Sequence, residues 1–427
     1  MAREIILQKL PVGWSYNLLD NIAERCSGHT PSKSFPEYWN GGIKWISLAD
    51  SFRLDKGYVY ETDKQISLEG IKNSSAEVHP AETVVLSRDA GVGKSGVMAT
   101  PMAVSQHFIA WKCDNKEKLH SWYLYNWLQL NKEEFERQAV GSTIKTIGLP
   151  YFKKLRIAVP PFDEQKKIAQ ILSAWDKAIS VTEKLLTNSQ QQKKALMQQL
   201  LTGKKRLGVP AGSYELKITR YGSIPKDWDY PAIKEICTQV SEKNSAAVDH
   251  PVLSCSKYDG FVDSLKYFNK KVYSDDLSGY RLIHRGCFGF PSNHIEEGSI
   301  GLQNLYDTGI VSPIYVVFRA SPTRVDKSYL YAVLKTDHYK QIFGAATNAS
   351  VDRRGSLRWK EFNQIHVPLP PLKEQQKIAA VLSAADAEIS ILEKKLTCLK
   401  DEKKALMQQL LTGKRRVKVE AEEVVSA

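Results

Sequence analysis

The chain has 427 residues, of which 42% are hydrophobic and 10% aromatic, and a formal net charge of +13. This length and composition exclude a disordered polypeptide and leave room for two or three domains with cores of their own. No apolar run approaches the length of a membrane span, and residues 1–20 lack the apolar core of a secretory signal. We therefore expect a cytoplasmic protein without a membrane partner, and the excess of cations favours a polyanionic one.

The first globular segment, residues 1–159, consists of short apolar runs separated by turns. Such runs, rich in β-branched and aromatic residues, are typical of strands. We expect strands at 43–46, 83–86 and 108–111, a helix over 119–130 and a final strand at 155–159. This mixture predicts an α+β domain.

A long helix is predicted over residues 160–206. It begins at the pair Pro160-Pro161, where a proline loses no helical hydrogen bond, and Gly203 is expected to end it. Acidic residues occupy its first turn, and the basic run Lys204-Lys205-Arg206 follows the glycine. The basic run could contact phosphate, but helix capping explains it equally well.

The second globular segment, residues 207–369, repeats the plan of the first with a different sequence. It has expected strands at 251–253, 314–318 and 364–367 and an expected helix over 327–335. A second long helix is predicted over 370–416, and a short tail, 417–427, follows it.

The two long helices are copies of each other. Every residue of the second copy lies 210 positions after its counterpart, and about two thirds of the aligned positions are identical. Both copies carry apolar residues at alternating steps of four and three, which predicts a heptad seam. The expected seam residues are Ile168, Leu172, Trp175, Ile179, Leu186, Leu196, Leu200, Ile378, Leu382, Ile389, Leu392, Leu396, Leu399, Leu406 and Leu410.

Two seams of equal length should pack on each other, because either seam alone would face water. The second helix starts from the segment that follows the first helix, so we expect an antiparallel coiled coil with one globular domain at each end. Each helix would be about 60 Å long. The alternative is an ordinary helical hairpin inside one domain. The predicted fold class is therefore α+β, with two mixed domains separated by two long antiparallel helices in a pseudo-two-fold repeat.

Motifs for intrinsic catalysis are incomplete. Gly91-Val92-Gly93-Lys94-Ser95 lacks the earlier glycine of a phosphate-binding loop, because Arg88 stands there. The residues before the two Pro-Pro pairs are Val159 and Leu369, which cannot accept hydrogen bonds from a target amine as an adenine methyltransferase requires. The six cysteines lie far apart without a CxxC pair, so we expect reduced thiols and no metal site.

The doubled helix resembles a known family. Copies that begin Pro-Pro, continue with Glu-Gln and Ile-Ala, and close with Met-Gln-Gln-Leu-Leu-Thr-Gly-Lys are similar to the specificity subunits of bacterial type I restriction–modification systems. Within the first segment, 27–32, 87–94 and 141–145 are similar to parts of such target recognition domains. The second segment departs from this pattern and has no Gly-x-Thr-Pro-Ser loop.

The resemblance implies a non-catalytic subunit. Each recognition domain would read one half of a split, asymmetric site in double-stranded DNA, and the helix pair would act as a ruler. Two modification subunits would supply S-adenosylmethionine chemistry at adenine N6, and two motor–nuclease restriction subunits would use ATP and Mg²⁺. No cofactor is expected in this chain. Dissimilar domains predict a non-palindromic site.

Base and phosphate contacts require cations and small polar residues on exposed loops. In the first domain the candidates are Ser32, Lys33, Arg88, Lys94, Ser142, Thr143 and Lys145. In the second they are Lys257, Tyr258, Arg285, Asn293, Arg353, Arg354 and Arg358. Each could equally be a solvated surface residue. Two other functions stay open: a two-headed protein-binding scaffold without nucleic acid, and a self-contained enzyme.

Overall fold

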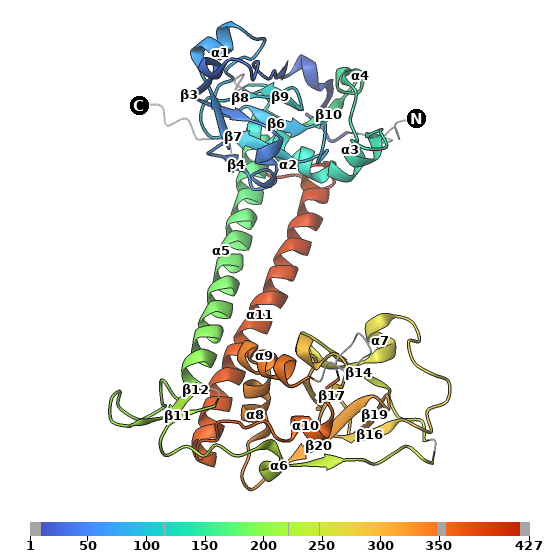
Figure 1. Cartoon of the computed structure of the whole chain (residues 1–427). Helices are drawn as coiled ribbons and strands as arrows, with labels where there is room; N and C mark the ends of the chain where they lie inside the picture. Colours follow the sequence, from blue (N-terminus) through green and yellow to red (C-terminus); the bar gives the residue numbers. More distant parts are fainter. Residues whose placement is uncertain (1–9, 114–116, 221, 247, 348–355, 419–427) are drawn as a thin grey trace, which may run out of the picture. The chain divides into compact units, whose positions relative to one another are not determined.

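The computed structural model describes residues 10–113, 117–220, 222–246, 248–347 and 356–418 (Figure 1). It divides into two compact units. The first comprises Met1–Glu183 and Lys394–Ala427, and the second comprises Lys184–Glu393. Both divisions fall inside a long helix, so each unit contains one mixed domain and a part of each long helix.

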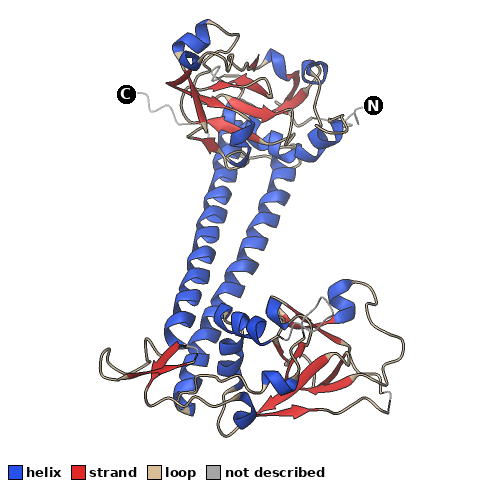
Figure 2. Ribbon diagram, viewed as in Figure 1, coloured by secondary structure: helices blue, strands red, loops and turns tan. Residues whose placement is uncertain are grey.

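The first domain is built on a five-stranded sheet with the order β2-β9-β6-β7-β4. Its strands are β2 Glu24–Ser27, β9 Phe108–Lys112, β6 Val84–Ser87, β7 Ser95–Met98 and β4 Tyr58–Val59. All four residues of the central strand β6 are buried, as its apolar run Val84-Val85-Leu86 predicts for the first three. Helix α2, Ser121–Leu130, packs on β6 and β7 and buries Tyr123 and Leu124. Figure 2 shows the strands and helices of this domain by type.

Smaller elements complete the first domain. A three-stranded sheet has the order β5-β3-β8, with β5 Lys64–Ile66, β3 Trp39–Ile46 and β8 Ala103–Val104. Strand β1, Ser15–Leu18, pairs with β10, Arg156–Val159. The short helices are η1 Leu19–Asn21, η2 Pro36–Tyr38, η3 Leu48–Phe52, α1 Leu68–Lys72, α3 Lys132–Gln138 and α4 Leu149–Lys153.

The second domain is built on a four-stranded antiparallel sheet with the order β13-β20-β17-β18. Its strands are β13 Cys237–Val240, β20 Tyr315–Ala320, β17 Phe288–Pro291 and β18 Gly301–Leu302. The domain also has three antiparallel two-stranded sheets: β11 Leu216–Thr219 with β12 Gly222–Pro225, β14 Leu253–Ser256 with β15 Gly260–Asp263, and β16 Arg281–His284 with β19 Thr308–Val311. The helices are α6 Ile233–Ile236, α7 Ser264–Phe268, η4 Ile295–Glu297, α8 Lys327–Leu334, α9 Asp337–Ala346 and α10 Trp359–Phe362.

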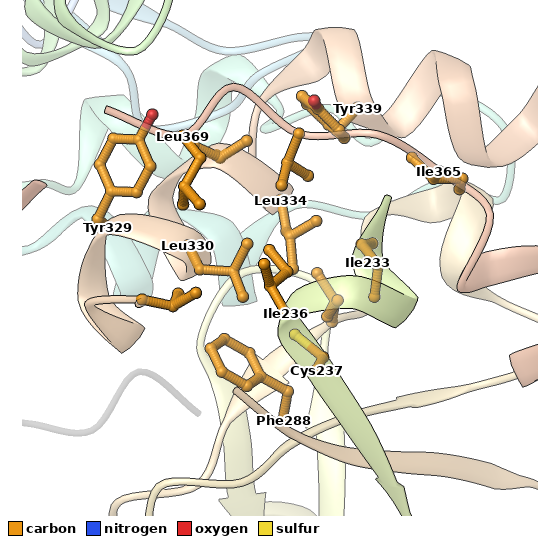
Figure 3. Close-up of a cluster of buried hydrophobic side chains, with 14 of the residues drawn as sticks. Ile233, Ile236, Cys237, Phe288, Tyr329, Leu330, Leu334, Tyr339, Ile365 and Leu369 are labelled. Atoms are coloured by element: carbon orange, nitrogen blue, oxygen red, sulfur yellow. The ribbon is translucent and has the colours of Figure 1, made fainter. Parts of the chain in front are cut away.

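The core of the second domain joins this sheet to its helices. Leu330 and Leu334 of α8 meet Ile236 of α6 and Phe288 of β17 in one buried cluster (Figure 3). The same cluster includes Ile378 at the start of the second long helix. The domain therefore shares its core with the helix segments of its own unit.

The long helices are α5, Phe162–Leu200, and α11, Leu372–Leu410. Each starts directly after its Pro-Pro pair, and each is followed by a glycine in the left-handed region, Gly203 at φ +70° and Gly413 at φ +72°. None of the helices in the described part of the chain combines the length and apolar character that crossing a bilayer requires.

Within each unit the two helix segments run antiparallel. In the first unit, Asp176 pairs with Lys403, and Glu183 pairs with Lys400 at 2.8 Å. In the second unit, Lys193 pairs with Asp386. As residue numbers rise along α5 they fall along α11. Asp386 and Lys193 are the counterparts of Asp176 and Lys403 at the offset of 210, so each unit contains the same ion pair. The predicted α+β class, with two mixed domains and long antiparallel helices, is confirmed.

The seam is most buried where each helix meets its domain. Ile168, Leu172, Leu200, Ile378, Leu382 and Leu410 are all less than 5% exposed. The remaining seam residues are half-buried: Trp175, Ile179, Leu186, Leu196, Ile389, Leu392, Leu396, Leu399 and Leu406. Two polar residues that interrupt the apolar pattern of α5, Thr182 and Ser189, are buried as well.

One expected strand does not form. Within residues 364–367 there is one isolated bridge, from His366 to Ala232, whereas the counterpart β10 pairs regularly with β1. Two prolines explain the difference. Pro231 and Pro368 lack the N–H groups that a continuous ladder needs, and the segment 15–18 contains no proline.

Candidate nucleic-acid interface

Two loops of the first domain that carry candidate DNA contacts lie side by side. Strand β6 ends at Ser87, and the carbonyl of Arg88 then accepts a hydrogen bond from the N–H of Ile147 at 2.9 Å. Thr146 forms bridges with both Asp89 and Val140. Residues 88–94 and 139–147, which are far apart in the sequence, therefore form one surface.

This surface is shallowly hollowed. A pocket of about 330 Å³ lies between the two loops, with Gly91 on one side and Thr143, Ile144 and Lys145 on the other. Glu136 contributes an acidic group to its wall. The pocket therefore offers hydroxyl and ammonium groups that can bond to a base edge or a phosphate, and a carboxylate that can accept from a base amino group.

The backbone fixes the second loop sharply. Gly141 has φ +131°, and a Cβ atom at this position would lie 2.3 Å from the carbonyl oxygen of Ile144. Any other residue would collide with the backbone of the loop. Glycine is thus required for the conformation that leaves Ser142, Thr143 and Lys145 exposed.

The cations of the first loop are partly engaged by the protein. Lys94 donates from Nζ to Ser51 Oγ at 3.0 Å, and Arg88 Nε lies 3.7 Å from Asp89 Oδ1. Asp89 also accepts from His107 Nδ1 at 2.8 Å. The hydrogen bonds of Lys94 and Asp89 orient the loop, and the Asp89 carboxylate offsets part of the charge of Arg88.

Ser32 and Lys33 occupy a separate loop of the same domain. Both are exposed, and the carbonyl of Ser32 accepts from the indole N–H of Trp39 at 3.2 Å. The loop is tied to β8 by a hydrogen bond from the N–H of His29 to the carbonyl of Val104. It belongs to the edge formed by β3 and β8 rather than to the pocket at Thr143.

The second domain places a loop at the equivalent position. Strand β17 ends at Pro291, and the carbonyl of Ser292 accepts from the N–H of Leu357 at 2.8 Å. Leu357 is the counterpart of Ile147 at the offset of 210. Asn293 and Arg358 therefore lie on neighbouring segments, and Arg358 stands at the N-terminus of α10. Arg353 and Arg354 lie outside the described residues.

Other candidates in the second domain lie on separate segments. Lys257 and Tyr258 form the exposed turn between β14 and β15, with the ammonium 5.4 Å from the ring centroid. Arg285 is paired with Asp307 at 2.9 Å, and it lines a pocket of about 350 Å³ together with Gln376 near the start of α11. Arg285 thus lies beside the start of the long helix α11 and not in the loop that carries Asn293.

The protein matches a family of known function. A model of the type I restriction modification DNA specificity domain matches residues 11–188 and again residues 225–401. The chain belongs to this family. The resemblance inferred from the doubled helix is therefore confirmed, and the protein is a DNA-binding specificity subunit of a type I restriction–modification system.

Known specificity subunits are similar along most of the chain. The MjaVIII specificity subunit of Methanocaldococcus jannaschii is 28% identical over 77% of this chain and 76% of the relative. The MjaIX specificity subunit of the same organism is 22% identical over 97% of this chain and 96% of the relative. The S subunit of a type I system from M. genitalium, known from a crystal structure, has a similar fold, with a TM-score of 0.56 at 14% identity over 95% of this chain and 98% of that one.

Several residues that connect the ends of the long helices in this specificity subunit were interpreted from the sequence only as charges at helix ends. Glu164 is 2% exposed and its carboxylate accepts from the guanidinium of Arg416 at 2.8 Å. At the offset of 210, Glu374 accepts from Arg206 at 2.9 Å. The only sequence signal for these pairs is that the acid and the base recur together in both copies.

A buried glutamine anchors each helix to its domain. Gln165 donates to the carbonyls of Pro160 and Lys118, and its side-chain oxygen accepts from the N–H of His120 at 2.8 Å. Gln375 makes the matching bonds in the second unit, accepting from the N–H of Asp326 at 2.8 Å. The helix starts are therefore structural joints, with no acid–base chemistry implied.

Proposed function

We propose that this specificity subunit reads a bipartite, asymmetric DNA sequence, one half with each domain. The observation that supports this proposal best is that the contacts of the long helices are repeated in the two units, whereas the exposed loops are not. Joints of the frame recur at the offset of 210, whereas the exposed loops at Thr143 and at Asn293 have unrelated sequences. A duplicated frame with two different loops supports two different half-sites rather than a palindrome.

The proposed readers are the paired loops of each domain. In the first domain, Ser142, Thr143 and Lys145 contact bases or phosphates, with Arg88 behind them. In the second domain, Asn293 and Arg358 take the equivalent place. Asparagine can bond bidentately to adenine, and arginine to guanine or phosphate, so these side chains have the required chemistry.

We further propose that the paired helices set the distance between the half-sites. Each helix is a continuous element of 39 residues that begins in one unit and ends in the other. A helix rises 1.5 Å per residue, so its length translates directly into a spacing along DNA. The ion pairs between the helices within each unit hold their register.

The subunit is proposed to act without a catalytic centre or cofactor of its own. Val159 and Leu369, the residues before the Pro-Pro pairs, are both 4% exposed and pack in the domain cores. They therefore start helices rather than contact a target base. Two modification subunits would bring S-adenosylmethionine to the DNA, and two restriction subunits would bring ATP and Mg²⁺.

Methylation mapping tests the bipartite reading. Cells that express this chain with its modification subunit should show methylated adenine in one split, non-palindromic sequence. The double variant Thr143→Ala/Lys145→Ala should relax or abolish one half-site and leave the other unchanged. Lys118→Ala is the matched control, because it removes an exposed lysine of the same domain outside these loops.

Binding to purified DNA gives a second test. With the modification subunit present, affinity should fall steeply with salt and should discriminate the intact site from half-site mutants. A methylated palindrome, or loss of both halves in the double variant with unchanged folding, would refute the proposal. Methyl transfer by the chain alone would refute its non-catalytic role.

A further inference from the structure

Three side chains of the first unit with metal-binding groups lie together, although they come from two distant segments. Cys26 lies on β2, and Glu77 and His79 lie on the extended segment that precedes β6. The thiol sulfur, a carboxylate oxygen and an imidazole nitrogen all lie within 4.8 Å of one another. Residues 77 and 79 alternate around Val78, as extended backbone requires for two side chains on one side.

His79 is the unusual member of this group. Its side chain is fully buried, and among the described residues neither ring nitrogen has a hydrogen-bond partner. Its backbone is fixed by two hydrogen bonds to Met102, at 2.8 and 3.0 Å. Burying polar nitrogens without partners is unfavourable, and such groups in native proteins usually have a ligand, water or ion. The imidazole is thus held rigidly in a place where the protein alone does not satisfy it.

The other two donors are also weakly engaged. The Cys26 sulfur has long contacts with Glu24, at 3.8 Å to the carbonyl and 3.9 Å to a carboxylate oxygen, and it also interacts with the side chain of Lys112. The Glu77 side chain is exposed and opens the group to solvent. Lys112 is the neighbouring cation, and its ammonium pairs with Glu24 at 2.9 Å.

We propose that Cys26, Glu77 and His79 form a Zn²⁺ site that ties β2 to the segment before β6. One thiolate, one imidazole and one carboxylate are a donor set that suits zinc, whereas Mg²⁺ and Ca²⁺ prefer oxygen alone. Glu24 or a water completes four ligands, with Glu24 released from Lys112 in the first case. The site is structural, and it is independent of the proposed DNA reading.

Protonation states agree with this arrangement. Burial lowers the pKa of His79, with the nearby Lys112 adding to the effect, so the imidazole is neutral at pH 7 and can donate a lone pair. Burial raises the pKa of the Cys26 thiol, so the thiol carries its proton until the metal displaces it. Binding should therefore release one proton near neutral pH and weaken in acid.

Cobalt titration of the full-length chain tests the site directly. After dialysis against chelator, Co²⁺ should produce a thiolate-to-metal charge-transfer band that saturates at one ion per chain, and Zn²⁺ should remove the band by competition. Cys26→Ser should abolish the band. Glu77→Gln should weaken binding at least tenfold, while Cys113→Ser, which alters a buried thiol outside the group, should leave binding unchanged.

The Glu77→Gln variant still tests the site if Cys26→Ser unfolds the domain. Glu77 is exposed, so its replacement should leave the circular dichroism spectrum unchanged. Absence of the charge-transfer band in the wild-type chain would overturn the proposal. So would a band of full strength in a folded Glu77→Gln variant. Neither measurement contains DNA, so failure here is separate from failure of the proposed DNA reading.

Discussion

Replacing Arg206 by Met should destabilise the second unit more than the equivalent change at Arg416 destabilises the first. Arg206 is 8% exposed and its partner Glu374 is 10% exposed. The guanidinium donates to both oxygens of Glu374 and to both oxygens of Asp227, and it lies 5.9 Å from the Trp228 ring. Its removal leaves a buried carboxylate with one remaining bond, from the Trp228 indole at 3.3 Å.

The expected loss at Arg206 is about 3 kcal/mol or more, the typical cost of breaking a buried ion pair from one side. Arg416 makes the same bonds to Glu164, but its side chain is 41% exposed. Water can therefore replace it, and the N–H of Val417 still reaches the carboxylate at 3.3 Å. We expect a loss of about 1–2 kcal/mol there, mostly from the charge-assisted hydrogen bonds.

Urea denaturation with hydrogen-exchange mass spectrometry measures both effects, because exchange in the first turns of α5 and α11 separates the two units. Lys226→Met is the control. Its pair with Glu215 is 70% and 77% exposed, so the loss should stay within about 0.5 kcal/mol. The double variant Arg206→Met/Glu374→Gln should recover part of the stability, because no unpaired charge is buried. Equal losses at Arg206 and Arg416, or a larger loss at Arg416, would refute the reasoning.

Three further predictions concern the first domain and the helices. Gly141→Ala should weaken specific DNA binding at least tenfold without changing the unfolding midpoint by more than a few degrees, since the strain is confined to an exposed loop; unchanged binding by anisotropy would contradict it. His120 caps α2 by accepting the N–H of Trp122, and burial lowers its pKa, so its contribution is present above about pH 6.5 and is lost as pH falls, with a slope up to about 1.4 kcal/mol per pH unit. Melting at pH 7.5 and 5.5 should show this loss in the wild type and less of it in His120→Asn, which keeps a cap that does not titrate. Seven residues inserted after both Glu183 and Glu393 should lengthen the methylated spacer by about three base pairs, whereas insertion after only one should abolish methylation.

The two long helices could be predicted from the sequence because their segment occurs twice in the chain. Periodicity identified the helices, and the observed limits, Phe162–Leu200 and Leu372–Leu410, lie inside the expected ranges. Pro-Pro and Gly positions act locally, so they are readable without tertiary information. The same holds for strand β6, three of whose four buried residues form one apolar run.

The partners of individual polar side chains on distant segments were not predictable. The basic run at Arg206 has the composition of a phosphate-binding segment, yet Arg206 is neutralised by an acid 168 positions later. Lys94 was a candidate for DNA because of its charge, but Ser51 holds its ammonium. The group around His79 left no signal either, because Cys26 lies some fifty positions before it in the sequence. In each case the deciding partner comes from the fold and not from the local pattern.

The internal repeat explains why the long helices are nearly the same in both copies whereas the loops of the two domains differ in sequence. A two-fold contact between identical surfaces satisfies both sides with one set of residues. Here one chain supplies both sides, so Asp176 and its counterpart Asp386 meet equivalent partners, Lys403 and Lys193, one pair in each unit. The loops at Thr143 and Asn293 have no such counterpart to match, because each would face its own segment of DNA. Under the proposed function, substitution at a joint is therefore constrained by packing, whereas substitution in a loop would be constrained by the half-site that its domain reads.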